Sequence, residues 1–178
     1  MSYWRNSRRR RTEKVAVTSS GTAVVTLPAD DQIFIKRKFA APKHIVYKAL
    51  TTPELVKRWW SSDYGEMTVA DIDLKVGGKW RYVMVTKDSR EVAFHGEYRE
   101  IVPNERVVST EAYEGVPDAD ANAAVNTVTL TEADGVTTMT VLVQCPSKDV
   151  RDVIINSGME VGMQKAYDYL EKVAVSLI

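Results

Sequence analysis

The C-terminal segment constrains the fold most strongly, because it carries one apolar stripe at helical spacing. The stripe steps by three or four positions through Ile155, Met159, Met163, Ala166, Leu170, Val173 and Leu177. Such spacing places these residues on one face of an α-helix. Ser147 is a candidate N-cap, and Asp149 stands in the first turn, where a negative charge interacts favourably with the helix dipole. We predict one continuous helix over 149–174 whose apolar face needs a partner.

Six strand-like runs precede this helix and offer that partner. They cover 66–74, 78–86, 92–102, 106–113, 125–131 and 136–143. Turn-forming residues such as Gly77-Gly78 and Asp134-Gly135 separate them. Consecutive strands that are joined by hairpins form an antiparallel meander, and one face of that sheet can bury the apolar stripe.

A further strand and two short helices come before the meander. Hydrophobic alternation predicts a strand at 33–39, and Pro42 favours a helix directly after it. Residues 52–54 combine an N-cap threonine, a proline and an acid, so they predict a second helix that carries Trp59 and Trp60. A short extra strand is predicted at 22–27. The complete order predicts an α+β fold, a curved antiparallel sheet wrapped around a long C-terminal helix with two short helices after the first strand.

Length and charge indicate one domain with a basic extension. The chain has 178 residues and is 44% hydrophobic, which fits a single globular domain. Residues 1–14 contain six basic residues against one acidic residue, whereas the whole chain has 24 of each. We predict a flexible basic tail at 1–20 and one domain at 21–178 with its core at 32–175. Because this domain has an excess of acidic residues, we expect no nucleic-acid partner.

Cysteine count and hydropathy exclude several further classes of protein. The single cysteine, Cys145, cannot form a disulfide within the chain, and a Cys-rich zinc site is excluded by the same count. No apolar run of about 18 residues could span a membrane. The N-terminus has no apolar segment of the kind found in secretory signals. We expect a cytoplasmic protein that holds no metal ion and no cofactor.

Five short motifs in a fixed order carry a resemblance to a known family. They are Phe39-Ala-Ala-Pro42, Thr52-Pro-Glu-Leu55 with Trp59-Trp60, the segments 73–82 and 95–103, and Ser157-Gly-Met-Glu-Val-Gly-Met163. Together they resemble the START-like superfamily (SRPBCC, Bet v 1-like), in the branch similar to the C-terminal domain of the heat-shock-protein-90 ATPase activator. The resemblance covers residues 32–175. It implies a helix-grip fold, in which the sheet and the long helix enclose an apolar cavity.

The resemblance also implies that inward-facing residues line a ligand cavity. Strand alternation places Trp80, Tyr82 and Met84 on one face of the sheet. The predicted ligand-binding residues are Trp59, Trp80, Tyr82, Met84, His95, Tyr98, Tyr113, Met139, Met159 and Met163. Plain core packing is the alternative role of the Met and Trp residues, and a structural hydrogen-bonding role is the alternative for His95. The predicted function is non-catalytic binding of an apolar small molecule, which could be a lipid, a polyketide or an aromatic natural product.

Two alternatives come from other members of the superfamily. One is a cyclase or hydrolase that uses His95 with Tyr98 or Tyr82 as acid and base. Since no Gly-x-Ser-x-Gly or comparable motif occurs, no catalytic residue is assigned. The other is a chaperone co-factor. The chain lacks the additional N-terminal domain of the full activator, so we do not expect a chaperone partner.

The long connection at 114–124 supports a third alternative. It exceeds the usual length of a hairpin loop, which is typical of a functional segment such as a lid. Some START-like proteins of antibiotic producers bind a DNA-cleaving enediyne and are themselves cleaved at a glycine. In a rough alignment Gly115 falls near that glycine, although the flanking residues differ. The resemblance thus implies self-sacrifice antibiotic resistance with cleavage at Gly115 as an alternative function.

Overall fold

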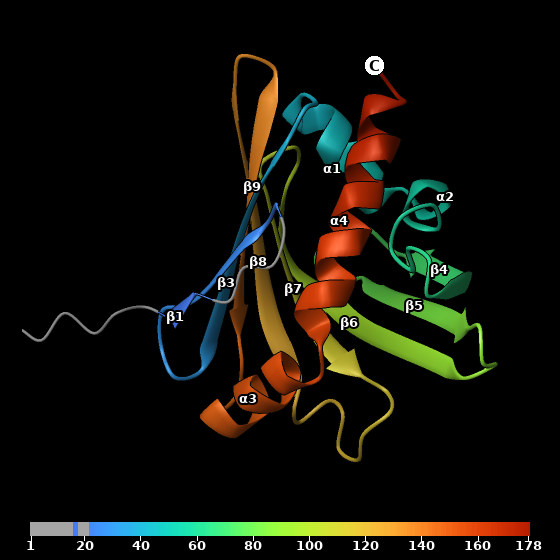
Figure 1. Ribbon diagram of the computed structural model, residues 1–178, viewed down its shortest axis with the longest axis vertical. Coiled ribbons are helices and arrows are strands. Elements are labelled where there is room, and N and C mark those ends of the chain that lie inside the picture. Colours follow the sequence, from blue (N-terminus) through green and yellow to red (C-terminus); the bar gives the residue numbers. More distant parts are fainter. Residues whose placement is uncertain (1–15, 18–21) are drawn as a thin grey trace, which may run out of the picture.

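The computed structural model describes residues 16–17 and 22–178 (Figure 1). The elements follow in the order β1 (Ala16–Val17), β2 (Val24–Leu27), β3 (Gln32–Phe39), α1 (Lys43–Thr51), α2 (Pro53–Val56), β4 (Gly65–Ile72), β5 (Lys79–Thr86), β6 (Glu91–Val102), β7 (Arg106–Tyr113), β8 (Ala124–Ala133), β9 (Val136–Gln144), α3 (Lys148–Asn156) and α4 (Met159–Val175). The strands form one sheet in the order β1-β2-β3-β9-β8-β7-β6-β5-β4. All neighbouring pairs are antiparallel.

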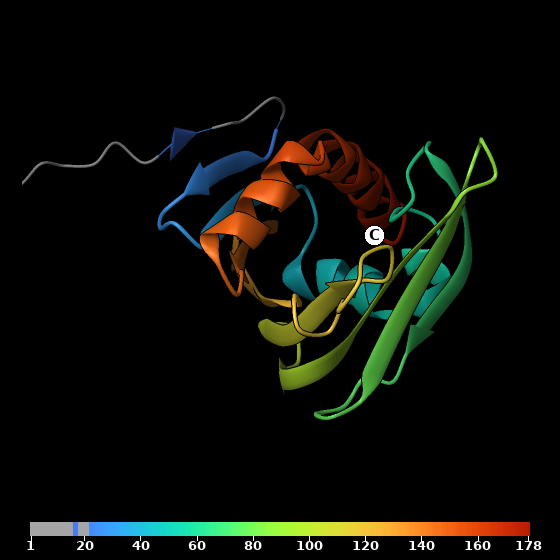
Figure 2. The ribbon, with the colours of Figure 1, turned by 90° about the horizontal axis from the view of Figure 1, so that it is seen from below.

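The sheet curves strongly, and α3 and α4 lie across the open side of the curve (Figure 2). Two register irregularities contribute to the curvature, one between Met67 and Val69 and one between Tyr98 and Glu100. We call the face of the sheet that is turned toward α4 the concave face. This arrangement confirms the predicted α+β helix-grip fold.

The hairpin between β8 and β9 shows how the sequence sets the strand order. Asp134 and Gly135 have φ angles of 53° and 74°, which a tight two-residue hairpin turn requires and which Asp-Gly adopts readily. The turn fixes the register so that Leu130 lies opposite Met139. Both side chains are buried.

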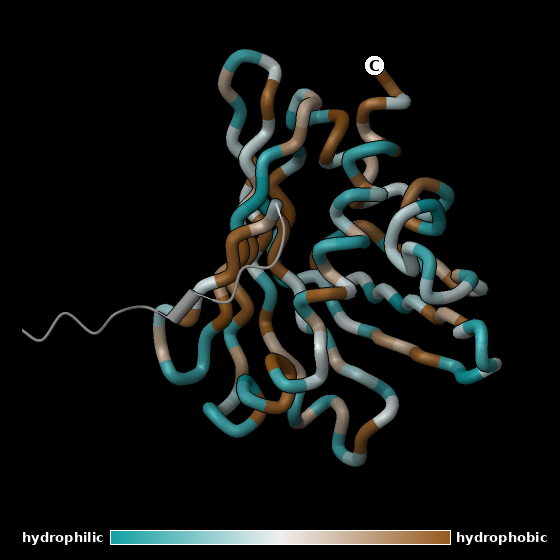
Figure 3. The backbone as a smooth tube through the Cα atoms, in the orientation of Figure 1, coloured by the Kyte–Doolittle hydropathy of each residue, from teal (hydrophilic) through white to brown (hydrophobic). Residues whose placement is uncertain are grey.

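The hydrophobic core lies between α4 and the sheet, is dense at β2, β3 and β9, and extends through α1 and α2 to β4, β5 and β6. Phe39, Ile33, Met139 and Leu170 are among the largest fully buried side chains. The tube coloured by hydropathy shows hydrophobic residues concentrated in the middle of these strands, beside the helix (Figure 3). The apolar stripe predicted from the sequence therefore has the sheet as its partner.

Polar contacts also hold α4 on this part of the sheet. Gln164 accepts a hydrogen bond from the backbone N–H of Ala23 at 2.9 Å and donates one to the carbonyl of the same residue at 2.7 Å. The buried guanidinium of Arg37 on β3 donates to Asp168 at 2.6 Å and to Glu171 at 2.9 Å. A fixed helix position follows from these two anchors.

The predicted continuous helix over 149–174 is wrong, because two helices occupy this segment. Gly158 has a φ of 81°, the left-handed conformation that ends a helix and that glycine adopts without a steric penalty. α3 and α4 therefore run in different directions (Figure 1). The predicted cap is present, since the Ser147 hydroxyl accepts from the Val150 N–H at 3.2 Å.

Two smaller expectations also need correction. α2 ends at Val56, and tighter turns follow in which the Trp59 N–H bonds the Val56 carbonyl, so Trp59 and Trp60 lie beyond the helix. Of the predicted flexible tail at 1–20, residues 16–17 form β1 and pair with β2, whereas the remainder lies outside the described residues. Among the helices of the described residues, none has the length and hydropathy to cross a membrane.

Candidate functional site

Aromatic side chains cover the concave face of β5, β6 and β7. Strand register places Tyr82 opposite Phe94 and Phe94 opposite Tyr113. The ring centroids of Trp80 and Tyr82 are 4.8 Å apart, and those of Phe94 and Tyr113 are 5.1 Å apart. Trp60, from the turn after α2, lies 5.6 Å from Tyr82 and 5.5 Å from Phe94. We call these five residues the aromatic cluster.

The cluster is buried at one end and open at the other. Trp80 is 6% exposed, whereas Tyr113 is 40% exposed. Trp60 and Phe94 are partly buried. Since α4 does not fully cover these rings, part of the aromatic surface remains available to another apolar group.

Gly96 allows the buried end of the cluster to form. A Cβ at this position would lie 2.5 Å from the indole nitrogen of Trp80 and 1.8 Å from the carbonyl oxygen of Thr110. Without a side chain on β6, the Trp80 N–H crosses the strand and donates to the Thr110 carbonyl on β7 at 3.2 Å. This bond fixes the orientation of the indole ring.

A group of polar residues, Glu111, Asn126 and Tyr167, lies on the same side of the sheet, and we call it the polar group. Glu111 shares a face of β7 with Tyr113, two residues further along. Asn126 of β8 lies opposite Ser109 of β7, and its side chain is hydrogen-bonded to the Glu111 carboxyl. The Asn126 Oδ1 atom is buried and has no partner among the described residues.

Loss of bulk solvent raises the pKa of the Glu111 carboxyl, and the bond from Asn126 offsets this only in part. Glu111 is nevertheless not fully buried by solvent accessibility. Burial also raises the pKa of the Tyr167 hydroxyl. The Glu111 carboxyl therefore has little water around it but is not closed off from solvent. Such a carboxyl can form a hydrogen bond with a ligand in a water-poor environment.

Two further tyrosines adjoin the polar group. The hydroxyls of Tyr82 and Tyr98 share a hydrogen bond, and burial raises both of their pKa values, that of Tyr98 to about 12. Tyr167 packs its ring edge-on against Phe39 at a centroid distance of 6.2 Å. At neutral pH all three phenols are therefore uncharged hydrogen-bonding groups.

The structure brings together a part of the predicted lining. Trp80, Tyr82, Tyr98 and Tyr113 share the concave face with Phe94, and Met84 continues the same face of β5. Met159 and Met163 of α4 are partly buried and pack against the core. Whether these side chains bind a ligand remains a prediction.

Three predicted residues lie away from the aromatic cluster. Trp59 is 7% exposed and donates its indole N–H to the Ala49 carbonyl of α1 at 3.0 Å. Met139 is 1% exposed and lies opposite Arg37 in the core. His95 alternates with Phe94 and Gly96, so its side chain points to the opposite, convex face. The expectation that His95 faces the same side of the sheet as the other predicted lining residues is therefore corrected by the structure.

On the convex face His95 holds the loop 114–123. Its Nδ1 lies 3.0 Å from Glu114 Oε1, and its Nε2 lies 2.7 Å from Asp120 Oδ1. Arg81 makes two further bonds of 2.8 Å to the Glu114 carboxylate. The bond to Asp120, followed by the one to Glu114, raises the pKa of His95. The Arg81 bonds lower the pKa of Glu114 to about 2, with a smaller contribution from His95.

Gly115 stands at the start of this loop, beneath an aromatic ring. A Cβ added to it would lie 2.3 Å from the ring of Tyr113, so the ring occupies the space that a side chain would take. The loop contacts the convex face through His95, which differs from the position expected of a lid over the concave face.

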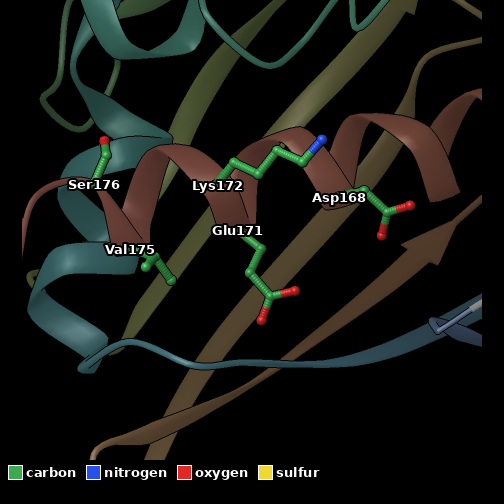
Figure 4. A pocket seen from close by; sticks show the side chains of 5 residues that line it. All are labelled: Asp168, Glu171, Lys172, Val175 and Ser176. Carbon is green, nitrogen blue, oxygen red and sulfur yellow. The ribbon is translucent and has the colours of Figure 1, made fainter.

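Two open surface pockets in the described part of the chain lie elsewhere. One, of about 580 Å³, runs along α4 and is lined by Asp168, Glu171, Lys172, Val175 and Ser176 (Figure 4). The other, of about 400 Å³, lies near Lys43 and Glu105, where β7 begins and the second half of β8 runs beside it. Neither pocket includes a predicted ligand-binding residue. The acids of the first pocket already bind Arg37.

Sequence reasoning missed Glu111, Asn126 and Tyr167. Alternation along 106–113 places Glu111 on the same face as Tyr113, so a signal for an inward-facing acid was available. Tyr167 stands one position from Ala166 of the helical stripe, and no feature of the sequence separates it from a core residue. Within the part of the chain that is described, no group of three or more His, Cys, Asp or Glu could hold a metal ion.

Comparisons with known proteins place this geometry in a wider context. The sequence model of the family described as Activator of Hsp90 ATPase homolog 1-like protein matches residues 40–174. No curated protein matches the chain. Several solved structures have the same fold. Their sequence identity to this chain is low, so the likeness shows the fold alone.

One such structure is a protein from Rhodobacter sphaeroides, with a TM-score of 0.78, 23% identity, and coverage of 85% of this chain and 97% of that chain. Protein Ms6760 from Mycobacterium smegmatis has a TM-score of 0.75, 23% identity, and coverage of 89% and 96%. Protein NE0264 from Nitrosomonas europaea has a TM-score of 0.74, 22% identity, and coverage of 84% and 97%.

Proposed function

The chain belongs to the family of Activator of Hsp90 ATPase homolog 1-like proteins, and on that premise we propose that it binds an apolar small molecule between α4 and the concave face of β5–β8. The observation that carries the proposal is the aromatic cluster, whose rings are packed together yet only partly covered. Ligand sites in proteins are mostly apolar and contain a few polar groups that orient the ligand.

The energetics favour an apolar ligand at this place. Each Å² of apolar surface removed from water contributes about 25 cal/mol. Trp60, Phe94 and Tyr113 keep exposed ring surface that a ligand would cover. Met84 and Met163, both partly buried, border the same side, and flexible methionines adapt to ligands of different shape.

The polar group supplies the orienting contacts. Glu111, Asn126 and Tyr167 lie beside the aromatic cluster, and Asn126 Oδ1 has no partner among the described residues. An apolar ligand with one polar end could bond these residues while its rings contact the aromatic cluster.

Binding of N-phenyl-1-naphthylamine, an uncharged probe whose fluorescence rises in apolar surroundings, tests this proposal. Met163→Trp would fill space on the inner side of α4, and we expect it to weaken probe binding at least tenfold. Val161→Trp is the matched control, because Val161 lies on the same helix and is 52% exposed. We expect the control to bind the probe as the unchanged protein does.

Equal weakening by both tryptophan variants would contradict the proposed location. A probe that fails to bind the unchanged, folded protein would contradict the proposed function itself. Circular dichroism of both variants separates these results from a loss of folding.

The position of Gly115 favours self-sacrifice resistance as a second candidate function. Gly115 lies against Tyr113, the open end of the aromatic cluster. An enediyne diradical bound to the cluster would take a hydrogen atom from the Gly115 Cα, and the flanking amides stabilise the glycyl radical. Dissolved dioxygen would add to this radical, and breakdown of the resulting peroxyl group would cleave the backbone. Mass spectrometry after incubation with an activated enediyne should then show cleavage beside Gly115 that Gly115→Val abolishes and Gly162→Ala leaves unchanged. An intact chain would dispose of this candidate.

A further inference from the structure

We infer, resting on the proposed function, that Glu111 and Asn126 select an aromatic ligand whose polar end donates hydrogen bonds and carries no negative charge, a phenol being the simplest example. The inference narrows the ligand from any apolar molecule to one chemical class. It assigns the recognition of the polar end to two neighbouring residues on β7 and β8.

Asn126 provides the first part of the argument. Its side chain is bonded to Glu111, and because a carboxylate only accepts, the amide N–H₂ is the donor in this bond. The remaining atom, Oδ1, accepts only, and it is buried without a partner among the described residues. A buried acceptor that lacks a donor is unfavourable, so a ligand that supplies an N–H or O–H relieves this cost.

Glu111 provides the second part. None of the ion pairs among the described residues involves Glu111. An anionic ligand beside it would face an unpaired carboxylate in a water-poor environment, or would require Glu111 to take up a proton. A ligand O–H or N–H can instead donate to the carboxyl oxygens in either protonation state.

The other ionisable groups around Glu111 do not offset this exclusion of anions. The hydroxyls of Tyr82 on β5 and Tyr167 on α4 interact with Glu111, and both are uncharged. Tyr98 of β6 is bonded to Tyr82 and has Tyr47 of α1 as a neighbour. The charge of Arg37 acts on Tyr167, and Arg37 already binds Asp168 and Glu171.

The aromatic cluster provides the third part, since it determines the rest of the ligand. Its rings meet at centroid distances between 4.8 and 5.6 Å in tilted and edge-on arrangements. Such arrangements favour a further aromatic ring over a flexible alkyl chain, because ring edges and faces attract each other.

Three ligands of one shape test the inference on the full chain by isothermal titration calorimetry. 2-Naphthol donates a hydrogen bond, 2-methoxynaphthalene only accepts, and 2-naphthoate is an anion. We expect 2-naphthol to bind about tenfold more tightly than 2-methoxynaphthalene, and 2-naphthoate to bind most weakly. The binding of 2-naphthoate should weaken further as the pH rises through the raised pKa of the Glu111 carboxyl, because Glu111 then loses its proton.

Two variants assign these preferences to the two residues. Asn126→Leu removes the unpaired oxygen and should reduce the tenfold preference for 2-naphthol to about twofold or less. Thr127→Val is the matched control, because Thr127 is the next residue of β8 and faces the opposite side of the sheet. Glu111→Gln keeps the size of the side chain and should remove the pH dependence of 2-naphthoate binding.

The outcomes separate this inference from the proposed function. Equal affinity for all three ligands would overturn the selection while leaving a general apolar site. An unchanged preference for 2-naphthol in folded Asn126→Leu would also overturn the selection. If Asn126→Leu does not fold, Glu111→Gln provides the test, and an unchanged pH dependence of 2-naphthoate binding in that variant would overturn the selection. Absence of binding by any of the three naphthalenes would overturn both proposals.

Discussion

The long helix meets the two halves of the sheet in different ways. Toward β2, β3 and β9, most interior polar groups have partners. Gln164 bonds both the N–H and the carbonyl of Ala23, and Arg37 binds two acids through its terminal nitrogens, while its Nε–H has no partner among the described residues. Toward β5–β8, the Asn126 oxygen has no partner within the described residues and no ion pair there involves Glu111. We call these the anchored half and the open half.

Because of this difference, we expect the anchored half to contribute mainly to the stability of the fold and the open half mainly to ligand binding. In the anchored half Gln164 and the terminal nitrogens of Arg37 already have protein partners, although the buried Arg37 Nε–H has none among the described residues, so a ligand would add little. In the open half, aromatic rings are partly exposed and the buried Asn126 Oδ1 has no partner among the described residues, so a ligand would cover the rings and donate to this oxygen. Substitutions in the two halves should therefore affect different measurements.

The largest expected effect concerns the anchored half. Leu170 is 0% exposed, and Leu170→Ala should lower the free energy of unfolding by about 3–5 kcal/mol, through lost burial and the cavity left behind. Urea denaturation followed by circular dichroism measures this change. Val161→Ala on the exposed side of the same helix should change it by less than about 0.5 kcal/mol. Similar losses for both variants would contradict the burial of the Leu170 side of α4 against the core.

The ion pairs of Arg37 should have the next largest effect. The side chain of Arg37 is 2% exposed, while those of Asp168 and Glu171 are 55% and 34% exposed. The double change Asp168→Asn with Glu171→Gln leaves the guanidinium buried without a carboxylate. We expect a loss of about 2–3 kcal/mol, below the usual cost of breaking a fully buried pair because solvent reaches both acids.

Denaturation of this double variant at low and high salt checks the assignment. The loss should persist at high salt, since the guanidinium is buried and salt screens buried charges weakly. A loss that disappears at high salt would show that the pairs behave as ordinary surface ion pairs.

The fold was largely predictable because it depends on periodic patterns. The turn residues Asp134-Gly135 and the alternation on each strand determine the meander, and the stripe from Ile155 to Leu177 determines the helix face. The break at Gly158 escaped prediction because the stripe continues in phase across it. A glycine within a helical pattern does not by itself reveal a left-handed φ.

The candidate site was only partly predictable. Aromatic residues on β5 and β6 follow from strand alternation, but the partner of Glu111 stands on β8, fifteen positions further along the chain. Which polar residues meet depends on strand register, and the register irregularity between Tyr98 and Glu100 is invisible in the sequence. The misplacement of His95 could have been avoided, because alternation puts it on the face opposite Tyr98, so the two could not both line one cavity.

A smaller effect should appear in the pH dependence of stability, with opposite signs for two glutamates. The folded pKa of Glu111 lies above its ordinary value of 4.5, so the native state holds the proton more tightly. Stability should therefore fall as the pH rises above 4.5, and Glu111→Gln should remove this decline. Urea denaturation between pH 5 and pH 8 measures it.

Glu114, on the convex side, provides the comparison. Its folded pKa is lowered to about 2, so its contribution is present above the ordinary value of 4.5 and is lost as the pH falls toward 2. Glu114→Gln should flatten the acid side of the stability curve and leave the side above pH 5 unchanged. The same pH profile for both variants would contradict the placement of the two carboxyls on opposite sides.

The smallest expected effect concerns His95 and the loop 114–123. Both ring nitrogens of His95 contact carboxylates, and both can donate only when the ring is protonated. The raised pKa means that this contribution is complete below the ordinary value of 6.5 and is lost as the pH rises through the folded pKa. Because the ring is partly exposed, His95→Gln should lower the free energy of unfolding by less than about 1 kcal/mol.

Hydrogen exchange of the backbone amides of 114–123 should nevertheless become severalfold faster in His95→Gln at pH 6. The matched control His44→Gln, at the other histidine, should leave this exchange unchanged. Unaltered exchange in His95→Gln would show that the loop is held by other contacts.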